Sequence, residues 1–350
     1  MAVGKVKERA FASISVQEAV ASFLTSLHVK HLRPKTQSEY RSELGFFAAW
    51  CQSLHITLDQ VNAKQVDAFL DHIKATHRPR QAHKQEISTY TLNSQVRVIL
   101  TFLNWCLDDE EYSHHVKADV VRRIKKPRVI KVIFETFNAE QIDALLAACA
   151  HEESDHLRLR DQAIIKLLLD TGIRATELCT LTIENVDLSP SDAHIKILGK
   201  GSKWGEVGMG TECRKLMSQY WRKFREPTLE DEIRQRTREK KLTDQQERRL
   251  KRELQETATF FMSRSGKPLT NNGLYQLIRR LGVWAKITGV RCSPHTLRHT
   301  FSVMFMRNGG DIYTLSKLLR HSSVKVTENY LKSIQQWEAR KAYKSVVDNL

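Results

Sequence analysis

The segment from Pro294 to Tyr330 constrains the fold of this chain most, because its apolar residues recur at the three- and four-residue spacing of amphipathic helices. Ser293 is a favoured helix-capping residue and Pro294 suits the first helical position, so the sequence predicts a helix that begins there. His295 and Arg298 then lie one turn apart on the same face of that helix. We therefore predict that this face presents a histidine and an arginine to one anion.

A second helix and a polar break follow in the same segment. Asp311 is predicted to cap a helix over residues 312–319, and the sequence R-H-S-S at residues 320–323 ends its apolar pattern. Tyr330 lies nine residues after His321. Tyrosine and histidine are often packing residues with a polar tip, so this segment considered alone also fits an ordinary protein surface.

The order and spacing of these groups resemble a known family. The pattern H-x-L-R-H at residues 295–299, the pattern L-L-R-H-S-S at residues 318–323 and the tyrosine at 330 resemble the C-terminal signature of the tyrosine recombinases, also called the phage integrase family. Upstream, T-G-I-R-A-T-E-L at residues 171–178 resembles the first arginine motif of that family. G-K-G-S-K at residues 199–203 resembles its lysine-bearing hairpin, although W-G-E at 204–206 and glycine at 208 replace the usual basic residues and proline. Without the resemblance, these two stretches would be interpreted as a surface ion pair and a solvated turn.

The resemblance implies a catalytic set of six residues and one supporting residue. Tyr330 is expected to attack a DNA phosphodiester and form a covalent 3′-phosphotyrosine, and Lys200 is expected to protonate the leaving 5′ oxygen, with Lys203 as its reserve. Arginines suit the extra negative charge of this reaction, since their planar forks stay protonated and grip phosphate oxygens in pairs. Histidines can donate to the same oxygens, and His295 can also accept the tyrosine proton. The six are Arg174, Lys200, His295, Arg298, His321 and Tyr330, with Glu177 orienting Arg174.

The charge balance favours a polyanionic partner. The chain has 56 lysines and arginines against 40 aspartates and glutamates, a net charge of +16, which favours nucleic acid through counterion release. It contains no run of 18 apolar residues and no signal-like start, so we expect no membrane partner and a cytoplasmic, nucleoid-associated protein. Its six cysteines lack C-x-x-C spacing and are interpreted as reduced core residues. Metal-ligand spacing is also missing, so we expect neither a metal nor another cofactor.

The N-terminal part is predicted to be a helical domain that binds DNA. After a basic tail over residues 1–12, residues 13–119 carry helical patterns that resemble the core-binding domain of the family. Basic and small polar residues at helix ends can hold DNA phosphates, although four-helix packing alone gives the same apolar stripes. The predicted DNA contacts are Arg33, Lys35, Thr36, Arg41, Asn93 and Arg97 here, and Lys203, Arg279 and Arg280 in the catalytic part.

A basic linker and a charged insertion complete the predicted organisation. Residues 120–134 are expected to join the two domains so that they close around duplex DNA, unless they form a basic edge with no such role. The catalytic domain is expected over residues 135–350, with a C-terminal tail at 331–350 and a helical insertion at about 225–257. Opposite charges recur four residues apart in the insertion, which favours helix over disorder. It either touches DNA or a neighbouring protomer, or is a solvated excursion.

The sequence therefore predicts a mainly α (α+β) fold, in which a helical core-binding domain precedes a mixed helical catalytic domain with a small antiparallel sheet. The predicted function is site-specific DNA recombination by a homo-tetramer on double-stranded DNA sites, monomeric in solution and serving a mobile element through integration, excision or transposition. Type IB topoisomerase-like relaxation of DNA is one alternative and chromosome dimer resolution is another. A DNA-binding protein without catalysis is a third, which the filled set of six residues disfavours.

Overall fold

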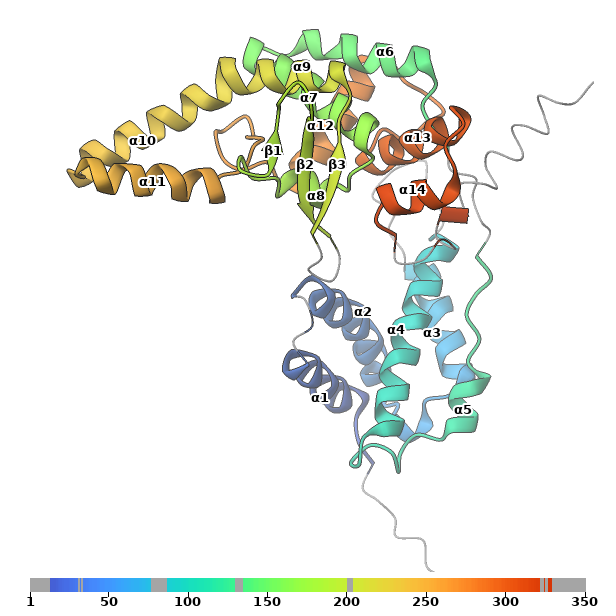
Figure 1. Cartoon of the computed structure of the whole chain (residues 1–350). Coiled ribbons are helices and arrows are strands. Elements are labelled where there is room, and N and C mark those ends of the chain that lie inside the picture. Colours follow the sequence, from blue (N-terminus) through green and yellow to red (C-terminus); the bar gives the residue numbers. More distant parts are fainter. Residues whose placement is uncertain are drawn as a thin grey trace, which may run out of the picture. The chain divides into compact units, whose positions relative to one another are not determined.

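The chain forms two compact units, Met1–Val132 and Ile133–Leu350 (Figure 1). The computed structural model describes residues 13–30, 32, 34–76, 87–129, 135–199, 204–321, 324, 327 and 328. Both units are built mainly of α-helices, and the second also contains a small antiparallel sheet. This confirms the predicted fold class.

The elements of the first unit are helices over its described residues, with one isolated β-bridge between Ser15 and Thr57. Ser15 accepts a hydrogen bond from the Glu18 backbone N–H at 3.1 Å, and Ser88 accepts one from the Thr91 N–H at the same distance, so each serine caps the helix that follows it. The helices are α1 (Val16–Val29), α2 (Pro34–Ser53), α3 (Ala63–Thr76), α4 (Thr89–Asp108) and α5 (Ala118–Arg123), with a short 3₁₀ turn at Leu58–Gln60.

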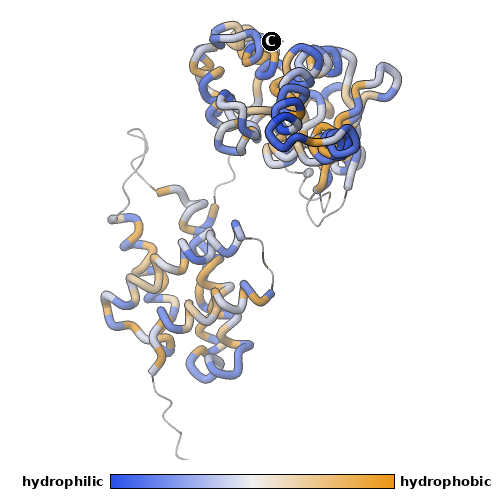
Figure 2. Tube along the Cα trace, turned by 90° about the vertical axis from the view of Figure 1, so that its left-hand side faces the viewer, coloured by the Kyte–Doolittle hydropathy of each residue, from blue (hydrophilic) through white to orange (hydrophobic). Residues whose placement is uncertain are grey.

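An aromatic cluster holds α1, α2 and α4 together. The ring of Phe23 lies 5.6 Å from Tyr40, 5.8 Å from Phe102 and 5.5 Å from Trp105, measured between ring centroids. Burying a large apolar side chain of this kind contributes about 1.5–3 kcal/mol. Figure 2 shows the corresponding pattern along the helices of this unit, where hydrophobic and hydrophilic residues alternate. The core follows from the amphipathic spacing in the sequence.

The first unit extends further along the chain than its predicted end at residue 119. Val121 lies on α5 and Ile124 follows it, and both are buried in the same core as α1 to α4. The basic residues Arg122 and Arg123 between them are exposed. The high charge of this stretch led to its prediction as a linker, although two of its apolar residues belong to the domain core. Residues 130–134 of the predicted linker lie outside the described residues.

The second unit packs its helices around α7. Gly172 ends α7 in the left-handed conformation, with φ 60°, and its N–H donates to the Leu168 carbonyl. Helices α9 and α13 pack against α7. The elements are α6 (Ala139–Ala148), a 3₁₀ turn at Cys149–His151, α7 (Asp155–Thr171), α8 (Ala175–Cys179), β1 (Val186–Asp187), β2 (His194–Leu198), β3 (Trp204–Gly208), α9 (Thr211–Tyr220), a π-helical turn at Trp221–Arg225, α10 (Glu226–Lys240), α11 (Asp244–Thr257), α12 (Asn271–Trp284), α13 (Pro294–Arg307) and α14 (Ile312–Leu318).

The sheet is antiparallel in the order β1-β2-β3, and it contains the hairpin that the sequence predicts. Ile195 on β2 pairs with Val207 on β3, and both are buried together with Ile197. The intervening residues of both strands face away from the core, as the two-residue period of a strand requires. The turn of this hairpin includes residues 200–203, which lie outside the described residues.

Helices α10 and α11 form a hairpin that extends away from the sheet (Figure 1). The helical character predicted for this stretch is therefore observed. Leu229, Ile233 and Leu254 are buried in the main core of the unit. Arg225, just before α10, is also buried and donates to the Thr259 carbonyl at 2.9 and 3.0 Å. The base of the hairpin thus belongs to the core, whereas most side chains further along it are exposed.

Candidate active site

Arg174 is fixed at the junction between α7 and α8 by a single carboxylate. The left-handed turn at Gly172 ends α7, and Arg174 occupies the position before the first turn of α8. The Arg174 backbone N–H donates to Glu177 Oε2 at 2.7 Å, and its guanidinium donates to Glu177 Oε1 at 2.9 Å. Burial raises the pKa of Glu177, but the Arg174 N–H and the charges of Arg320 and Arg174 outweigh it and lower that pKa. Glu177 therefore stays ionised and orients Arg174.

Arg298 is buried and held by the ends of two other helices. Ser293 caps α13 by accepting a hydrogen bond from the Thr296 N–H at 3.2 Å, as the sequence predicts. One turn into the helix, the Arg298 guanidinium donates to the Gly172 carbonyl and, at 2.8 Å, to the Leu319 carbonyl. Carbonyl groups orient a guanidinium without cancelling its charge. These two hydrogen bonds fix the orientation of Arg298, and a guanidinium stays protonated, which suits an anion-binding role.

His321 contacts Arg298 directly. Its Nε2 lies 3.2 Å from an Arg298 guanidinium nitrogen, and its Nδ1 lies 2.8 Å from the Thr327 hydroxyl. Because arginine can only donate, Nε2 is the acceptor and the ring proton is on Nδ1, toward Thr327. Burial, followed by the charge of Arg298, lowers the pKa of His321 to about 4. The ring is therefore neutral at pH 7.

His295 lies on the same face of α13 and feels the same charges. Its ring contacts His299 edge to face, with centroids 4.1 Å apart. Partial burial lowers the pKa of His295, and so do the positive charges of Arg298, Arg291 and Arg174. His295 is therefore neutral at pH 7. The residue is also exposed to solvent, so its ring is able to accept a proton from a bound group.

Four of the six predicted catalytic residues therefore meet in one place. Arg174 also donates to the backbone carbonyl of Arg320 at 3.4 Å, next to His321, which contacts Arg298. We call the two arginines and the two neutral histidines the Arg–His cluster, and its positive charge comes from the arginines. Lys200 and Tyr330 lie outside the described residues, and their roles stay predictions. Sequence reasoning missed Arg320 and Thr327, which contact Glu177 and His321 respectively. Arg320 lies within the polar break at residues 320–323, whereas nothing in the sequence pattern singled out Thr327.

The predicted DNA contacts are placed in different environments. Asn93 donates to the Pro127 carbonyl at 2.9 Å, within the first unit. Arg280 points inward, where it pairs with Glu152 and lies 3.6 Å from Asp161, so its guanidinium has a structural role that the sequence did not predict. Arg33 and Lys203 lie outside the described residues. Lys35, Arg41, Arg97 and Arg279 are exposed, and Thr36 is half-buried.

The carboxylate partner of Arg280 explains its inward position. Burial raises the pKa of Glu152, but the hydrogen bond and charge of Arg280 and the charge of Arg264, 2.9 Å away, outweigh it and lower that pKa. A buried ionised carboxylate needs such partners. Arg280 is thus held by a residue 128 positions away along the chain.

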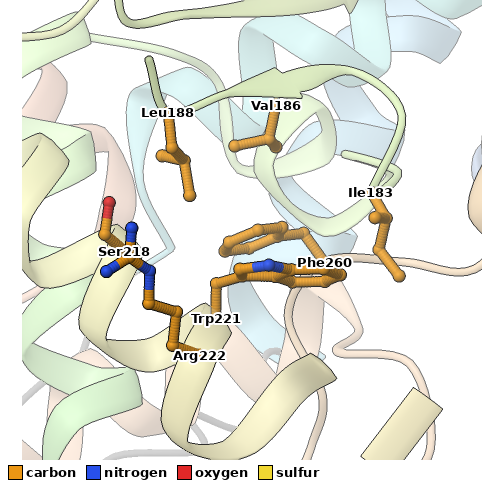
Figure 3. A pocket seen from close by; sticks show the side chains of 7 residues that line it. All are labelled: Ile183, Val186, Leu188, Ser218, Trp221, Arg222 and Phe260. Carbon is orange, nitrogen blue, oxygen red and sulfur yellow. The ribbon is translucent and has the colours of Figure 1, made fainter. Parts of the chain in front are cut away.

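A pocket of about 330 Å³ lies near the base of the α10–α11 hairpin and shares no residue with the Arg–His cluster (Figure 3). Trp221 and Phe260 form one wall, where their rings stack with centroids 5.9 Å apart. The other lining residues are Ile183, Val186, Leu188, Ser218 and Arg222.

Among the described residues, no group of three or more histidines, cysteines, aspartates or glutamates has a metal-binding arrangement. The described helices also include none long and apolar enough to cross a membrane.

Comparison with known proteins relates this geometry to one family. The Phage integrase family matches residues 135–336. The tyrosine recombinase XerD of Pseudomonas aeruginosa is 29% identical over 309 residues, which cover 88% of this chain and 90% of that protein. The crystal structure of the XerH site-specific recombinase bound to a palindromic difH substrate, a post-cleavage complex, has a TM-score of 0.67 at 18% identity and covers 94% of this chain and 84% of that one. The lambda integrase tetramer bound to a Holliday junction has a TM-score of 0.59 at 13% identity, over 89% and 78% of the two chains.

Proposed function

This chain belongs to the Phage integrase family and is a site-specific tyrosine recombinase, and we propose that it cleaves and rejoins DNA through the residues clustered at Arg174 and Arg298. The observation that carries this proposal is the convergence of two arginines and two histidines from separate segments. A guanidinium nitrogen of Arg298 lies 3.2 Å from His321 Nε2, and the guanidinium of Arg174 donates to the backbone carbonyl of Arg320, the residue before His321. This cluster matches the charge that builds on the non-bridging oxygens of a phosphate under attack.

The proposed reaction is a transfer of the phosphoryl group to tyrosine. A bond forms between the phenolic oxygen of Tyr330 and the phosphorus, and the bond from phosphorus to the 5′ oxygen breaks. His295, which its lowered pKa keeps unprotonated at pH 7, takes the phenolic proton, and Lys200 gives a proton to the 5′ oxygen. The product is a 3′-phosphotyrosine, an ester that a second DNA strand can attack without ATP.

The sign of the charge supports DNA as the partner. With a net charge of +16, the chain gains affinity for a duplex by releasing its counterions. Lys35, Arg41 and Arg97 are exposed on α2 and α4 and are our proposed phosphate contacts in the first unit. We further propose that a homo-tetramer assembles on paired DNA sites from protein that is monomeric in solution.

The proposed nucleophile is tested with a nicked suicide substrate, which traps the covalent intermediate. Tyr330→Phe should abolish the covalent complex and leave the Kd for DNA nearly unchanged, because only the attacking hydroxyl is lost. Tyr313, which is exposed on α14, provides a matched control, and Tyr313→Phe should cleave like the wild type. A covalent complex that survives Tyr330→Phe would refute the assignment.

A type IB topoisomerase-like activity is the alternative reaction on the same chemistry. It predicts relaxation of supercoiled plasmids by a monomer without any site dependence. Plasmids with and without paired sites separate the two reactions, because site-specific recombination requires the sites.

The biological role is proposed to be strand exchange for a mobile element, and the similarity to XerD favours chromosome dimer resolution as a second candidate. Sequencing the DNA ends that are covalently attached to the protein in its host distinguishes them. Ends at the boundaries of an inserted element support the first role. A single recurring chromosomal site supports the second.

A further inference from the structure

Arg320 has a backbone conformation that its residue type disfavours. It follows α14 with φ 51°, in the left-handed region where glycine is the usual residue. A bulky residue persists there when its surroundings hold it in place. Arg320 is held by its side chain, which is only 15% exposed and donates to Glu177 Oε2 at 2.7 Å and to the Leu318 carbonyl at 3.1 Å.

Glu177 is shared between Arg320 and Arg174. Its Oε1 accepts from the Arg174 guanidinium at 2.9 Å, and its Oε2 accepts from Arg320 at 2.7 Å. A buried carboxylate paired with Arg174 alone would cancel most of the charge that Arg174 offers to a phosphate. With Arg320 as a second cation, the three groups together carry one net positive charge, and Glu177 orients Arg174 without neutralising it.

The backbone of Arg320 adds a second contact to Arg174. Its carbonyl accepts from the Arg174 guanidinium at 3.4 Å, and the next residue, His321, accepts from Arg298. A change in the path of the chain at residue 320 would therefore move the Arg174 acceptor and the His321 ring at once.

The stem of Arg320 also lies against the hairpin. A Cβ atom added to Gly205 on β3 would lie 3.0 Å from Arg320 Cδ, so the strand approaches this side chain closely. In the sequence, β3 follows the turn that contains Lys200. Arg320 therefore lies between the anchor of Arg174 and the strand that leads out of the lysine-bearing turn.

We propose that Arg320 is a positioning residue that holds Arg174 through Glu177 and packs against β3, so that the two arginines and the hairpin keep one fixed arrangement. This inference rests on the proposed function. Arg320 itself does not contact the DNA in this proposal. Loss of its side chain should lower the rate of cleavage, since a small displacement of a phosphate-binding group slows the reaction.

Arg320→Gly is the sharpest test, because glycine suits the left-handed backbone and only the side chain is lost. We expect the single-turnover cleavage rate on the nicked substrate to fall on the order of 10²-fold, with the Kd for DNA nearly unchanged. Free guanidinium ion should restore part of the rate, which would not happen if the variant were merely misfolded. Arg320→Lys keeps the charge without the fork and should cleave at an intermediate rate.

The route through Glu177 is tested by a double-mutant cycle. Arg320→Gly combined with Glu177→Gln should lose less than the product of the two single losses, because both changes remove the same interaction. Lys317→Ala, which removes an exposed cation from α14, is the matched control and should cleave like the wild type.

The outcomes separate this inference from the proposed function. A wild-type protein that forms no covalent complex would overturn the proposed function and this inference with it. A wild-type protein that cleaves, together with an Arg320→Gly variant that cleaves equally fast, would overturn the role of Arg320 alone. Independent losses in the double-mutant cycle would also overturn it.

Discussion

The arginines of the Arg–His cluster and those of the α10–α11 hairpin are the same residue type in opposite electrostatic settings. On α10, Arg236 pairs with Glu232 at 2.6 Å, and Arg234 pairs with Glu230 at 3.1 Å and with Asp231 at 3.2 Å. In the cluster, Arg298 donates to two backbone carbonyls, and two arginines share Glu177. The hairpin is balanced locally, whereas the cluster keeps a surplus of positive charge.

This difference shows that the number of arginines in a segment does not identify an anion site. An arginine with its own carboxylate at the surface offers a phosphate little, since the two charges offset each other in high dielectric. An arginine held by neutral acceptors is equally well ordered and keeps its charge. To recognise an anion site, one should therefore compare whether each guanidinium donates to a charged carboxylate or to a neutral carbonyl.

The largest expected effect comes from replacing the buried arginine. Arg298→Lys keeps one charge but loses the paired donors, so we expect the single-turnover cleavage rate to fall about 10²–10³-fold, as when one preorganised donor is removed from other enzymes. A carbonyl left without its donor should also lower the free energy of unfolding by about 1–3 kcal/mol. Cleavage assays and denaturant titration measure the two effects. The matched change Arg234→Lys on α10 should leave cleavage unchanged, and equal effects at both positions would break the comparison.

A second expected effect is that the buried histidines beside the arginines make stability depend on pH. Burial, and then the charge of His295, lowers the pKa of His299 to about 3, and burial with Arg298 lowers the pKa of His321 to about 4, from 6.5. Between these values and 6.5 the unfolded chain binds protons that the folded chain does not, so stability is lost as the pH falls. We expect the Tm to decrease from pH 7 to pH 4.5.

The contribution of one histidine is separable by substitution. His299→Gln does not titrate, so its Tm should fall less steeply over the same pH range. Identical slopes for the two proteins would show that the buried histidine does not couple folding to pH.

The smallest expected effect is at the hairpin. Arg236→Gln removes the pair with Glu232, in which both side chains are about a third or more exposed, so the free energy of unfolding should change by no more than about 0.5 kcal/mol. The denaturant midpoint measures this change, and the cleavage rate should stay the same. A loss of cleavage would mean that the α10–α11 hairpin contributes to the reaction. The contrast between its arginines and those of the Arg–His cluster would then be wrong.

Local features of the fold were predictable from the sequence. The caps at Ser293 and Asp311 were both identified correctly, because a helix start depends on residues within one turn of it. The β2–β3 hairpin was also expected, because residues 199–203 resemble the lysine-bearing hairpin of the family. The insertion was predicted to be helical, but its sparse apolar positions did not indicate that Leu229, Ile233 and Leu254 complete the main core.

The contacts that define the site were not predictable, because they join distant parts of the chain. Arg298 donates to Gly172, 126 positions away, and Arg320 donates to Glu177, 143 positions away. The resemblance to a family indicated which residues to expect at the site, but not which groups hold them. Arg280 illustrates the same limit, since its charge suggested a DNA contact and its partner Glu152 is revealed only by the fold.

The carbonyls that orient Arg298 belong to the C-terminal ends of α7 and α14, so this side chain ties three helices together. A descendant of this protein that lost strand exchange would still need a guanidinium at position 298, because the buried Gly172 and Leu319 carbonyls would otherwise lose their hydrogen-bond donor. We therefore expect Arg298 to be retained in relatives that have lost the activity. Its presence in a relative is a poor diagnostic of a working enzyme, and loss of the nucleophile should be the earlier sign of decay.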